Sequence, residues 1–391
     1  MGLEDVAQAA RLRFFHGNFS GGPPERRMES HNMWDKLVLW CCGKFFMLLI
    51  TMGAGVRRRR MSHNQGTAGR GKLRIVDNPQ FPATDFFDPG REFPCRLRHG
   101  CVSFFDDCVN EVRSGTIKFA DSDFESPLDI QMNTGEHCFF WTARTFLQFA
   151  FWRHRKGTTQ YEKFYKTYGW GRRSAASAFR RTPTSYATMY YHSHTPFGWH
   201  ARDGKLRYAR FRLISGGHAP ELDAPDLAYV DLCEKELAQA SILAKQKCLP
   251  QDEPKSVNYL NHEWRDRLKQ GPITYILQLQ LHEVSPSDPP EILNSLLPWD
   301  QTTHPFIDLA TLSITEELSY AEQSYMGFEI TNKPSSMSIL PSKSIDDFNS
   351  LNYMRKQSIW TIRMRRFMQR LFGPPSNAPD DAPHGMSPPG M

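Results

Sequence analysis

The segment from Arg60 to Gly71 places one histidine, His63, in a glycine-rich cationic run. An imidazole can accept or donate a proton near neutral pH, so His63 is a candidate general acid or base. Arg60 lies three residues earlier and could bind an anionic group, while Gly66 allows close approach of the backbone to a ligand. The same composition also fits a solvated turn beside a charged face, because four arginines, Arg57 to Arg60, follow one another.

Two further residues fall into register with this segment. Arg98 lies 38 residues after Arg60, and Asn133 lies 70 residues after His63, at the end of a short apolar strand. This arrangement resembles the catalase superfamily, whose proteins carry Arg-x-x-His-x-x-Gly-x-x-x-x-Gly, then an arginine on the next strand, then Asn-Thr. The separation of the histidine and the asparagine is most similar to the allene oxide synthases, the fatty-acid-hydroperoxide branch of that superfamily.

The resemblance implies a fold, a cofactor and several residue roles. We expect an α+β protein with a catalase-like antiparallel β-barrel, surrounding helices and a long wrapping segment, and haem b as the iron cofactor. The resemblance implies that His63 moves a proton between the two oxygens of a peroxide and that Asn133 holds one oxygen by a hydrogen bond. It also implies that Arg60 and Arg98 pair with the haem propionates, for which guanidinium is better suited than ammonium.

Two more positions take their interpretation from the resemblance. True catalases keep a valine just before the histidine, whereas the allene oxide synthase branch keeps a threonine whose hydroxyl bonds to it. Ser62 occupies this position and is expected to favour hydroperoxide chemistry over fast H2O2 disproportionation, although a serine here also fits an ordinary turn. Phe146 lies 13 residues after Asn133, where the family keeps a phenylalanine against the haem face.

The chain departs from the family on the other side of the haem. The family's iron ligand is a tyrosinate in Arg-x-x-x-Tyr, where the arginine lowers the pKa of the phenol. Arg355 supplies the arginine and is expected beside the cofactor, but Ile359 stands at the tyrosine position and cannot ligate iron. Tyr353 is the nearest phenol and is kept as a candidate metal ligand, although it precedes the arginine and would point elsewhere on a helix.

A second departure lies beside Arg98. The family has Arg-Phe-Ser where this chain has Arg98-His-Gly100, which removes a hydroxyl expected behind the histidine.

Hydrophobic periodicity predicts the elements that must position these residues. Residues 72–140 indicate short strands, and residues 140–155 indicate an aromatic-rich helix. Residues 222–269 suit helices with a connecting loop. Residues 273–281 alternate strictly and predict a half-buried barrel strand.

Length and composition divide the chain into three parts. The resemblance implies a catalase-like haem domain over residues 57–372, and the 40% apolar content of the chain is ample for a large core. Residues 1–56 form an N-terminal arm, in which residues 37–55 approach transmembrane length but are interrupted by Gly43 and Lys44. A membrane anchor therefore stays open as an alternative to an amphipathic arm. The tail, residues 373–391, is rich in Pro, Asp and Ser and is expected to be disordered.

Charge and cysteine content narrow the class of protein. A net charge of +6 with scattered arginines suits an anionic small ligand and argues against nucleic acid binding. The eight cysteines form no Cys-x-x-Cys pair, which indicates reduced thiols and a cytoplasmic location, with membrane association as the alternative.

Two classes of function follow. The first is a haem-dependent, catalase-related oxidoreductase acting on hydrogen peroxide or on organic hydroperoxides such as those of fatty acids. The second is a non-enzymatic relative that keeps the barrel but binds haem weakly or not at all. Assembly into a homo-oligomer is left open by the sequence.

Overall fold

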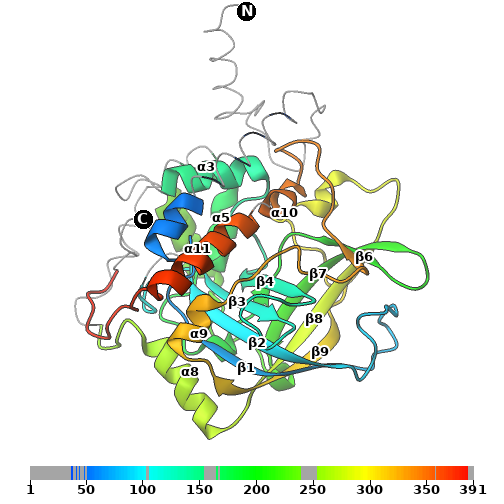
Figure 1. Cartoon of the computed structure of the whole chain (residues 1–391). Helices are drawn as coiled ribbons and strands as arrows, with labels where there is room; N and C mark the ends of the chain where they lie inside the picture. Colours follow the sequence, from blue (N-terminus) through cyan, green and yellow to red (C-terminus); the bar gives the residue numbers. More distant parts are fainter. Residues whose placement is uncertain are drawn as a thin grey trace, which may run out of the picture.

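Figure 1 shows the computed structural model of the chain, in which a curved sheet is flanked by helices. The structure describes residues 51–102, 105–153, 164, 165, 168–238, 253–356 and 358–385, together with positions 37, 41, 44 and 48. Most of the expected N-terminal arm and the last six residues of the expected tail therefore lie outside the described residues.

Eight antiparallel strands close into a barrel, as the resemblance predicted. Neighbouring strands follow the order β7, β5, β4, β3, β2, β1, β9, β8, and β8 closes the ring by pairing with β7. The strands are β1 Ala68–Ile75, β2 Glu92–Cys101, β3 Arg113–Lys118, β4 Asp129–Thr134, β5 Tyr191–His192, β7 Leu206–Ser215, β8 Ile273–Glu283 and β9 Ile307–Glu317. Two short strands, β6 Phe197–His200 and β10 Met337–Ser338, extend the sheet beyond β7.

The barrel interior is a packed apolar core. Phe87, Phe93, Phe119 and Trp199 fill it with contacting aromatic rings. His99 is also fully buried, and its Nε2 lies 2.9 Å from the hydroxyl of Tyr275. Burial lowers the pKa of His99 to about 3, so this histidine is neutral and structural.

Strand β8 was predicted to be half-buried, and the structure corrects this. Ile273, Tyr275, Leu277 and Leu279 are buried as expected, but Gln278 and Gln280 on the other face are buried too. The reason is that the chain after β8 passes over this face, where Gln280 donates to the backbone carbonyl of His304 at 2.6 Å. The wrapping segment therefore covers the barrel wall.

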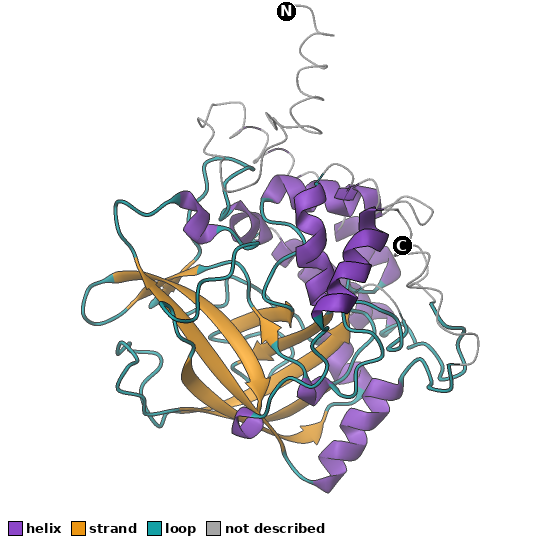
Figure 2. Ribbon diagram, turned by 180° about the vertical axis from the view of Figure 1, so that it is seen from behind, coloured by secondary structure: helices purple, strands orange, loops and turns teal. Residues whose placement is uncertain are grey.

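Figure 2 shows most of the helices gathered on one side of the barrel. The α-helices are α3 Ala143–Arg153, α5 Arg172–Ala178, α6 Leu227–Ala238, α8 Tyr259–Gln270, α9 Tyr320–Tyr325, α10 Ser350–Arg355 and α11 Ser358–Phe372. Short 3-10 turns are η2 Gly169–Gly171, η3 Tyr186–Thr188, η4 Gly216–His218 and η5 Pro290–Leu293. The predicted aromatic helix corresponds to α3, and the predicted helical region 222–269 contains α6 and α8.

Both ends of the described chain pack on this helical side. Residues 51–57 form a helix beside α11, where the hydroxyls of Thr51 and Thr361 lie 2.9 Å apart. Among the described residues, none of the helices has the length and apolar character needed to cross a bilayer. In the tail, Ala378 is buried against Phe105 and Val257, so residues 373–385 are ordered on the body of the protein, in contrast to the predicted disorder.

Candidate functional site

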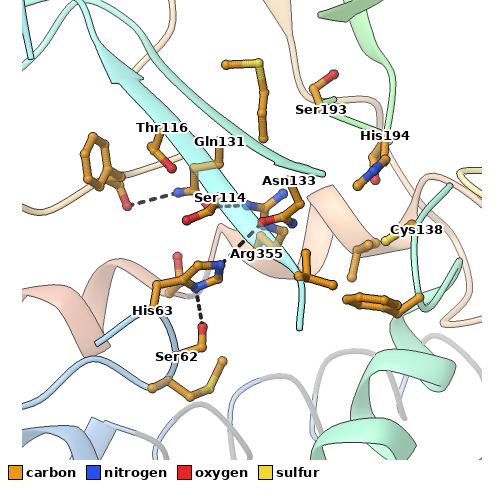
Figure 3. A pocket seen from close by; sticks show the side chains of 18 of the residues that line it. Ser62, His63, Ser114, Thr116, Gln131, Asn133, Cys138, Ser193, His194 and Arg355 are labelled. Atoms are coloured by element: carbon orange, nitrogen blue, oxygen red, sulfur yellow. Dashed lines mark hydrogen bonds between the residues drawn. The ribbon is translucent and has the colours of Figure 1, made fainter. Parts of the chain in front are cut away.

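A cavity of about 290 Å³ lies between one wall of the barrel and the helices α3, α10 and α11. Alternation along the strands supplies its polar wall: Ser114 and Thr116 on β3 and Gln131 and Asn133 on β4 face it, whereas the neighbouring Ile117 and Ile130 face the barrel core. Figure 3 shows these polar side chains converging on the space above His63.

His63 lies on the loop before β1 and is held from both ring nitrogens. The hydroxyl of Ser62 lies 2.7 Å from Nδ1, and the side-chain oxygen of Asn133 lies 3.4 Å from Nε2 (Figure 3). The backbone N–H of His63 donates to the carbonyl of Val102 at 2.9 Å. The contact to Asn133 is long for a hydrogen bond, so both groups can still turn to a ligand in the cavity.

The backbone around His63 is shaped by close approach to β2. His63 itself has a φ of 61°, in the left-handed region that non-glycine residues rarely adopt. Gly66 has a φ of 154°, and a Cβ there would lie 2.1 Å from the carbonyl oxygen of His99. The glycine three residues after the histidine is therefore required sterically.

The missing hydroxyl beside Arg98 has a structural explanation. A Cβ at Gly100 would lie 2.8 Å from the carbonyl oxygen of Gln65 and 3.6 Å from Cβ of His63, so a serine does not fit. The hydroxyl that bonds Nδ1 of His63 comes from Ser62 instead.

Three arginines meet at one corner of the cavity without a carboxylate partner among the described residues. Arg60 and Arg365 both donate to the carbonyl of Met326, at 2.6 and 2.8 Å, and Arg98 donates to the carbonyl of Asn64 at 3.2 Å. The Nε atom of Arg98 is buried and has no hydrogen-bond acceptor in the described part of the chain. This corner offers positive charge and unused donors to a ligand.

The electrostatics of this corner also favour the binding of an anionic ligand. Burial lowers the pKa of Arg98 to about 10 and that of Arg365 to about 9, and the neighbouring positive charges add to the effect on Arg365. Burial and the charges of Arg365 and Arg98 hold the pKa of Arg60 well below its usual value. Three crowded guanidinium groups that destabilise one another are suited to binding a group with more than one negative charge.

The rest of the cavity wall is mainly aromatic on one side and includes Arg355 on the other. Phe146 on α3 lines the cavity and packs against Phe140 with ring centroids 4.9 Å apart. Arg355 at the end of α10 hydrogen-bonds to the side-chain oxygen of Gln131 on β4, so it reaches across to the barrel wall (Figure 3). Burial lowers the pKa of Arg355.

The structure brings seven of the eight residues predicted for the site to one cavity. Those lining it are Arg60, Ser62, His63, Arg98, Asn133, Phe146 and Arg355. Tyr353 is the exception: it is not among the described lining residues, and its ring packs under Nζ of Lys356 at 4.6 Å. The helical face that lines the cavity carries Ser358, Thr361 and Ile362. In the described part of the chain, no tyrosine lines this cavity.

Sequence reasoning missed Arg365 and Gln131. Arg365 lies in a basic run that matched no motif, but helical spacing could have found it, because Ser358, Ile362 and Arg365 recur on the face that continues from Arg355. Gln131 lies two residues before Asn133 on the same strand, so both side chains must face the same way.

The residues that line the cavity suit a haem in two respects, but one residue that a haem would need is missing. The corner of Arg60, Arg98 and Arg365 suits two carboxylates, and a cavity lined by His63, Asn133 and aromatic side chains suits a flat ring with a polar substrate beside it. The phenol that would ligate the iron is not in place.

Comparisons with known proteins agree with this geometry. The chain is 38% identical over 315 residues to the allene oxide synthase-lipoxygenase protein of Plexaura homomalla, which covers 79% of this chain and 28% of that protein. It is 28% identical over 305 residues to the linolenate 9R-lipoxygenase of Nostoc sp., covering 75% of this chain and 37% of that protein. The chain thus spans well under half the length of these relatives. No protein-family profile matches it.

Solved structures show the fold. Catalase A from Saccharomyces cerevisiae superposes with a TM-score of 0.60 at 14% identity, covering 87% of this chain and 67% of the catalase. A bacterial catalase superposes with a TM-score of 0.56 at 15% identity, covering 80% of this chain and 60% of that one. The chain therefore has the fold of the catalases, and over 79% of its length its sequence is similar to the allene oxide synthase-lipoxygenase protein of Plexaura homomalla.

Proposed function

We propose that this protein is a haem-dependent oxidoreductase that acts on an organic hydroperoxide, with a fatty acid hydroperoxide as the favoured substrate. The observation that carries the proposal is the arrangement of His63 between Ser62 and Asn133 at the wall of the cavity. The name of the Plexaura relative, an allene oxide synthase-lipoxygenase, supports a lipid hydroperoxide as the substrate class.

Residues that line the cavity would hold the haem. Arg60, Arg98 and Arg365 would bind its two carboxylates, and Phe146 would pack on its flat face. Bound haem would supply the iron at which a peroxide O–O bond is cleaved. Tyr353 stays the candidate iron ligand of the sequence prediction, although it is not among the described residues that line the cavity.

His63 and its neighbours would control the proton. Ser62 fixes the ring through Nδ1, which leaves Nε2 facing the cavity to take the proton of a hydroperoxide and return it to the departing oxygen. Asn133 would hold the peroxide oxygen beside Nε2.

The wall of the cavity favours a large substrate over H2O2. Phe139, Phe140 and Phe146 give it an apolar side that can receive an acyl chain. Ser62 also favours a large hydroperoxide over H2O2, because the resemblance implies that true catalases have a valine at its position.

One observation favours the second class of function, in which the protein is a non-enzymatic relative that binds haem weakly. Arg355 bonds to Gln131 across the cavity, and the described lining residues include no tyrosine. A ligand-binding or interaction role is therefore the alternative. A homo-oligomeric state and a cytoplasmic location stay predictions of the sequence.

The deciding experiment is an absorption spectrum of the protein produced with haem supplied. The proposal expects stoichiometric ferric haem, and Tyr353→Phe should change its charge-transfer bands if that phenol reaches the iron. A folded protein without haem would overturn the enzyme proposal in favour of the alternative.

Activity measurements then separate the substrates. The haem-loaded protein should consume a fatty acid hydroperoxide without releasing oxygen, and His63→Ala should lower the rate by about 100-fold or more while retaining haem. Oxygen evolution from H2O2 as the faster reaction would contradict the lipid assignment. Tyr325→Phe, a tyrosine on α9 outside the cavity lining, is the control for Tyr353→Phe.

A further inference from the structure

Helix α11 turns its large apolar side chains to solvent and several polar ones inward. Trp360, Met364, Phe367 and Leu371 are between 41% and 63% exposed, and their spacing of three or four residues places them on one stripe. The buried residues of the same helix are Thr361, Arg365, Arg366 and Gln369. This pattern is inverted relative to a helix that only packs on a soluble core.

The helix of residues 51–57 extends this stripe. It lies beside α11 (Figure 1), and a Cβ at Gly55 would lie 2.7 Å from Cγ of Met364, so the two helices are in close contact. Met52 is 59% exposed and Val56 is 77% exposed. We define the apolar face as the six side chains Met52, Val56, Trp360, Met364, Phe367 and Leu371.

Positive charge lies beside the apolar face. Residues 51–60 and 358–372 each contain four arginines and no acidic residue. Of these eight arginines, Arg60 and Arg365 line the cavity, and Arg366 and Arg370 lie within 4 Å of a carboxylate. Arg57 and Arg363 are exposed, and neither has an ion-pair partner among the residues that the structure describes. An apolar stripe with arginines beside it is the pattern of a helix that lies in the interface of an anionic membrane.

We propose that the apolar face docks this protein on the surface of an anionic lipid bilayer. The apolar side chains would enter the region below the headgroups, Trp360 would lie at the boundary between water and lipid, and Arg57 and Arg363 would contact the phosphates. The helices lie along the membrane surface and do not cross it.

Charge makes a bilayer a better partner than a second copy of the chain. A symmetric pair of apolar faces would bring Arg57 and Arg363 close to the same residues of the other copy, and like charges repel. Anionic lipid headgroups would instead attract both Arg57 and Arg363.

The position of the apolar face also connects it to the cavity. The opposite side of α11 lines the cavity through Ser358, Thr361 and Ile362. A helix is about 10 Å across, so docking would bring the cavity to within roughly that distance of the lipid. The docking proposal goes beyond the proposed function, and its test requires no haem and no turnover.

Vesicle flotation of the full-length protein tests the docking. The vesicles are phosphatidylcholine alone, or phosphatidylcholine with phosphatidylserine as roughly one lipid in three. We expect binding to the mixed vesicles, weaker binding at high salt, and at least about a tenfold loss of partitioning for Trp360→Ser/Phe367→Ser. The matched control is Leu222→Ser/Leu232→Ser, whose leucines are 64% and 53% exposed elsewhere. It should bind like the parent protein.

Two further measurements keep the test decisive. All the substituted side chains are exposed, so each variant should unfold at the temperature of the parent, and Arg363→Glu should weaken binding to the mixed vesicles only. Absence of binding by the parent, or equal losses in variant and control, would overturn the proposal. The proposal would also be overturned if the parent protein sediments as a dimer, does not bind vesicles, and becomes a monomer in the variant Trp360→Ser/Phe367→Ser. The apolar face would then join two copies of the chain.

Discussion

Buried cations in two parts of this molecule have different kinds of partner. On the barrel wall and at α3, Lys118 pairs with Asp129 at 2.9 Å and Arg144 pairs with Asp346 at 2.7 Å. At the corner of the cavity, Arg60, Arg98 and Arg365 have only neutral acceptors among the described residues. We interpret a buried charge paired with a carboxylate as serving the fold, and a group of buried charges without a carboxylate as a candidate site for an anionic ligand.

Removing a paired cation should have the largest effect on stability. Lys118 and Asp129 are both fully buried, so Lys118→Met leaves a carboxylate without its counterion and should lower the free energy of unfolding by about 3–5 kcal/mol. Urea denaturation measures this. The matched control is Lys72→Met, because Lys72 is 78% exposed and 3.9 Å from its partner Glu92. A change for Lys118→Met no larger than that of the control would contradict the comparison.

Asp107 and Arg113 are an intermediate case that sharpens the comparison. They are adjacent and buried, but Arg113 donates to the backbone carbonyls of Asp107 and Val109 rather than to a carboxylate. The Asp107 carboxylate accepts from the hydroxyl of Tyr186 at 3.1 Å. Burial raises the pKa of Asp107 to about 7.

This raised pKa predicts a dependence of stability on pH. Between about pH 4 and pH 7 the folded state keeps a proton that the unfolded state has released, so stability present at low pH is lost as the pH rises through the folded pKa. The loss amounts to at most about 4 kcal/mol. We expect Asp107→Asn to flatten this fall in unfolding free energy, measured by urea denaturation across that range. An unchanged slope would show that Asp107 does not titrate there.

Removing an unpaired cation should affect binding rather than folding. Arg365→Met relieves repulsion at the corner, so the haem-free protein should be as stable as the parent to within about 1 kcal/mol, or more stable. Haem affinity should fall by about 10- to 100-fold, followed by absorbance titration. Arg91→Met, at an exposed arginine stacked on Phe93, is the control and should leave haem affinity unchanged. A large loss of stability in Arg365→Met would place this arginine with the structural group.

The smallest effect is expected at the neutral contact to His63. Ser62→Ala removes one hydrogen bond of 2.7 Å to Nδ1 and no charge, so it should cost about 0.5–1.5 kcal/mol of transition-state stabilisation and little stability. Steady-state kinetics with a fatty acid hydroperoxide check this, and Ser62→Thr should restore most of the activity. A loss as large as that of His63→Ala would mean that Ser62 does more than orient the ring.

The strands and the polar wall of the cavity were predictable because alternation fixes which side chains share a face. His63, Arg98 and Asn133 were assigned because their spacing resembles that of the catalase superfamily, and the structure places them around one cavity. The covered face of β8 could not be foreseen, because its burial depends on a segment 24 residues later that has no periodicity of its own.

Other features depend on contacts that a local pattern does not contain. The tail has the composition of a disordered segment, yet Asn258 donates to the carbonyl of Ala378 at 3.0 Å and Asp106 accepts from the backbone N–H of Gly385 at 2.7 Å. Arg365 was hidden among other arginines, since its role depends on which of them faces inward. The inverted exposure of α11 likewise follows from its packing.

The left-handed backbone of His63 has a consequence for engineering. A side chain in this region costs about 1–2 kcal/mol that a glycine would not, so the fold would gain from losing its candidate proton carrier. A directed-evolution campaign that selects only for heat resistance would therefore favour glycine at this position and yield robust but inert proteins. Selection for thermal tolerance in this scaffold has to be coupled to turnover.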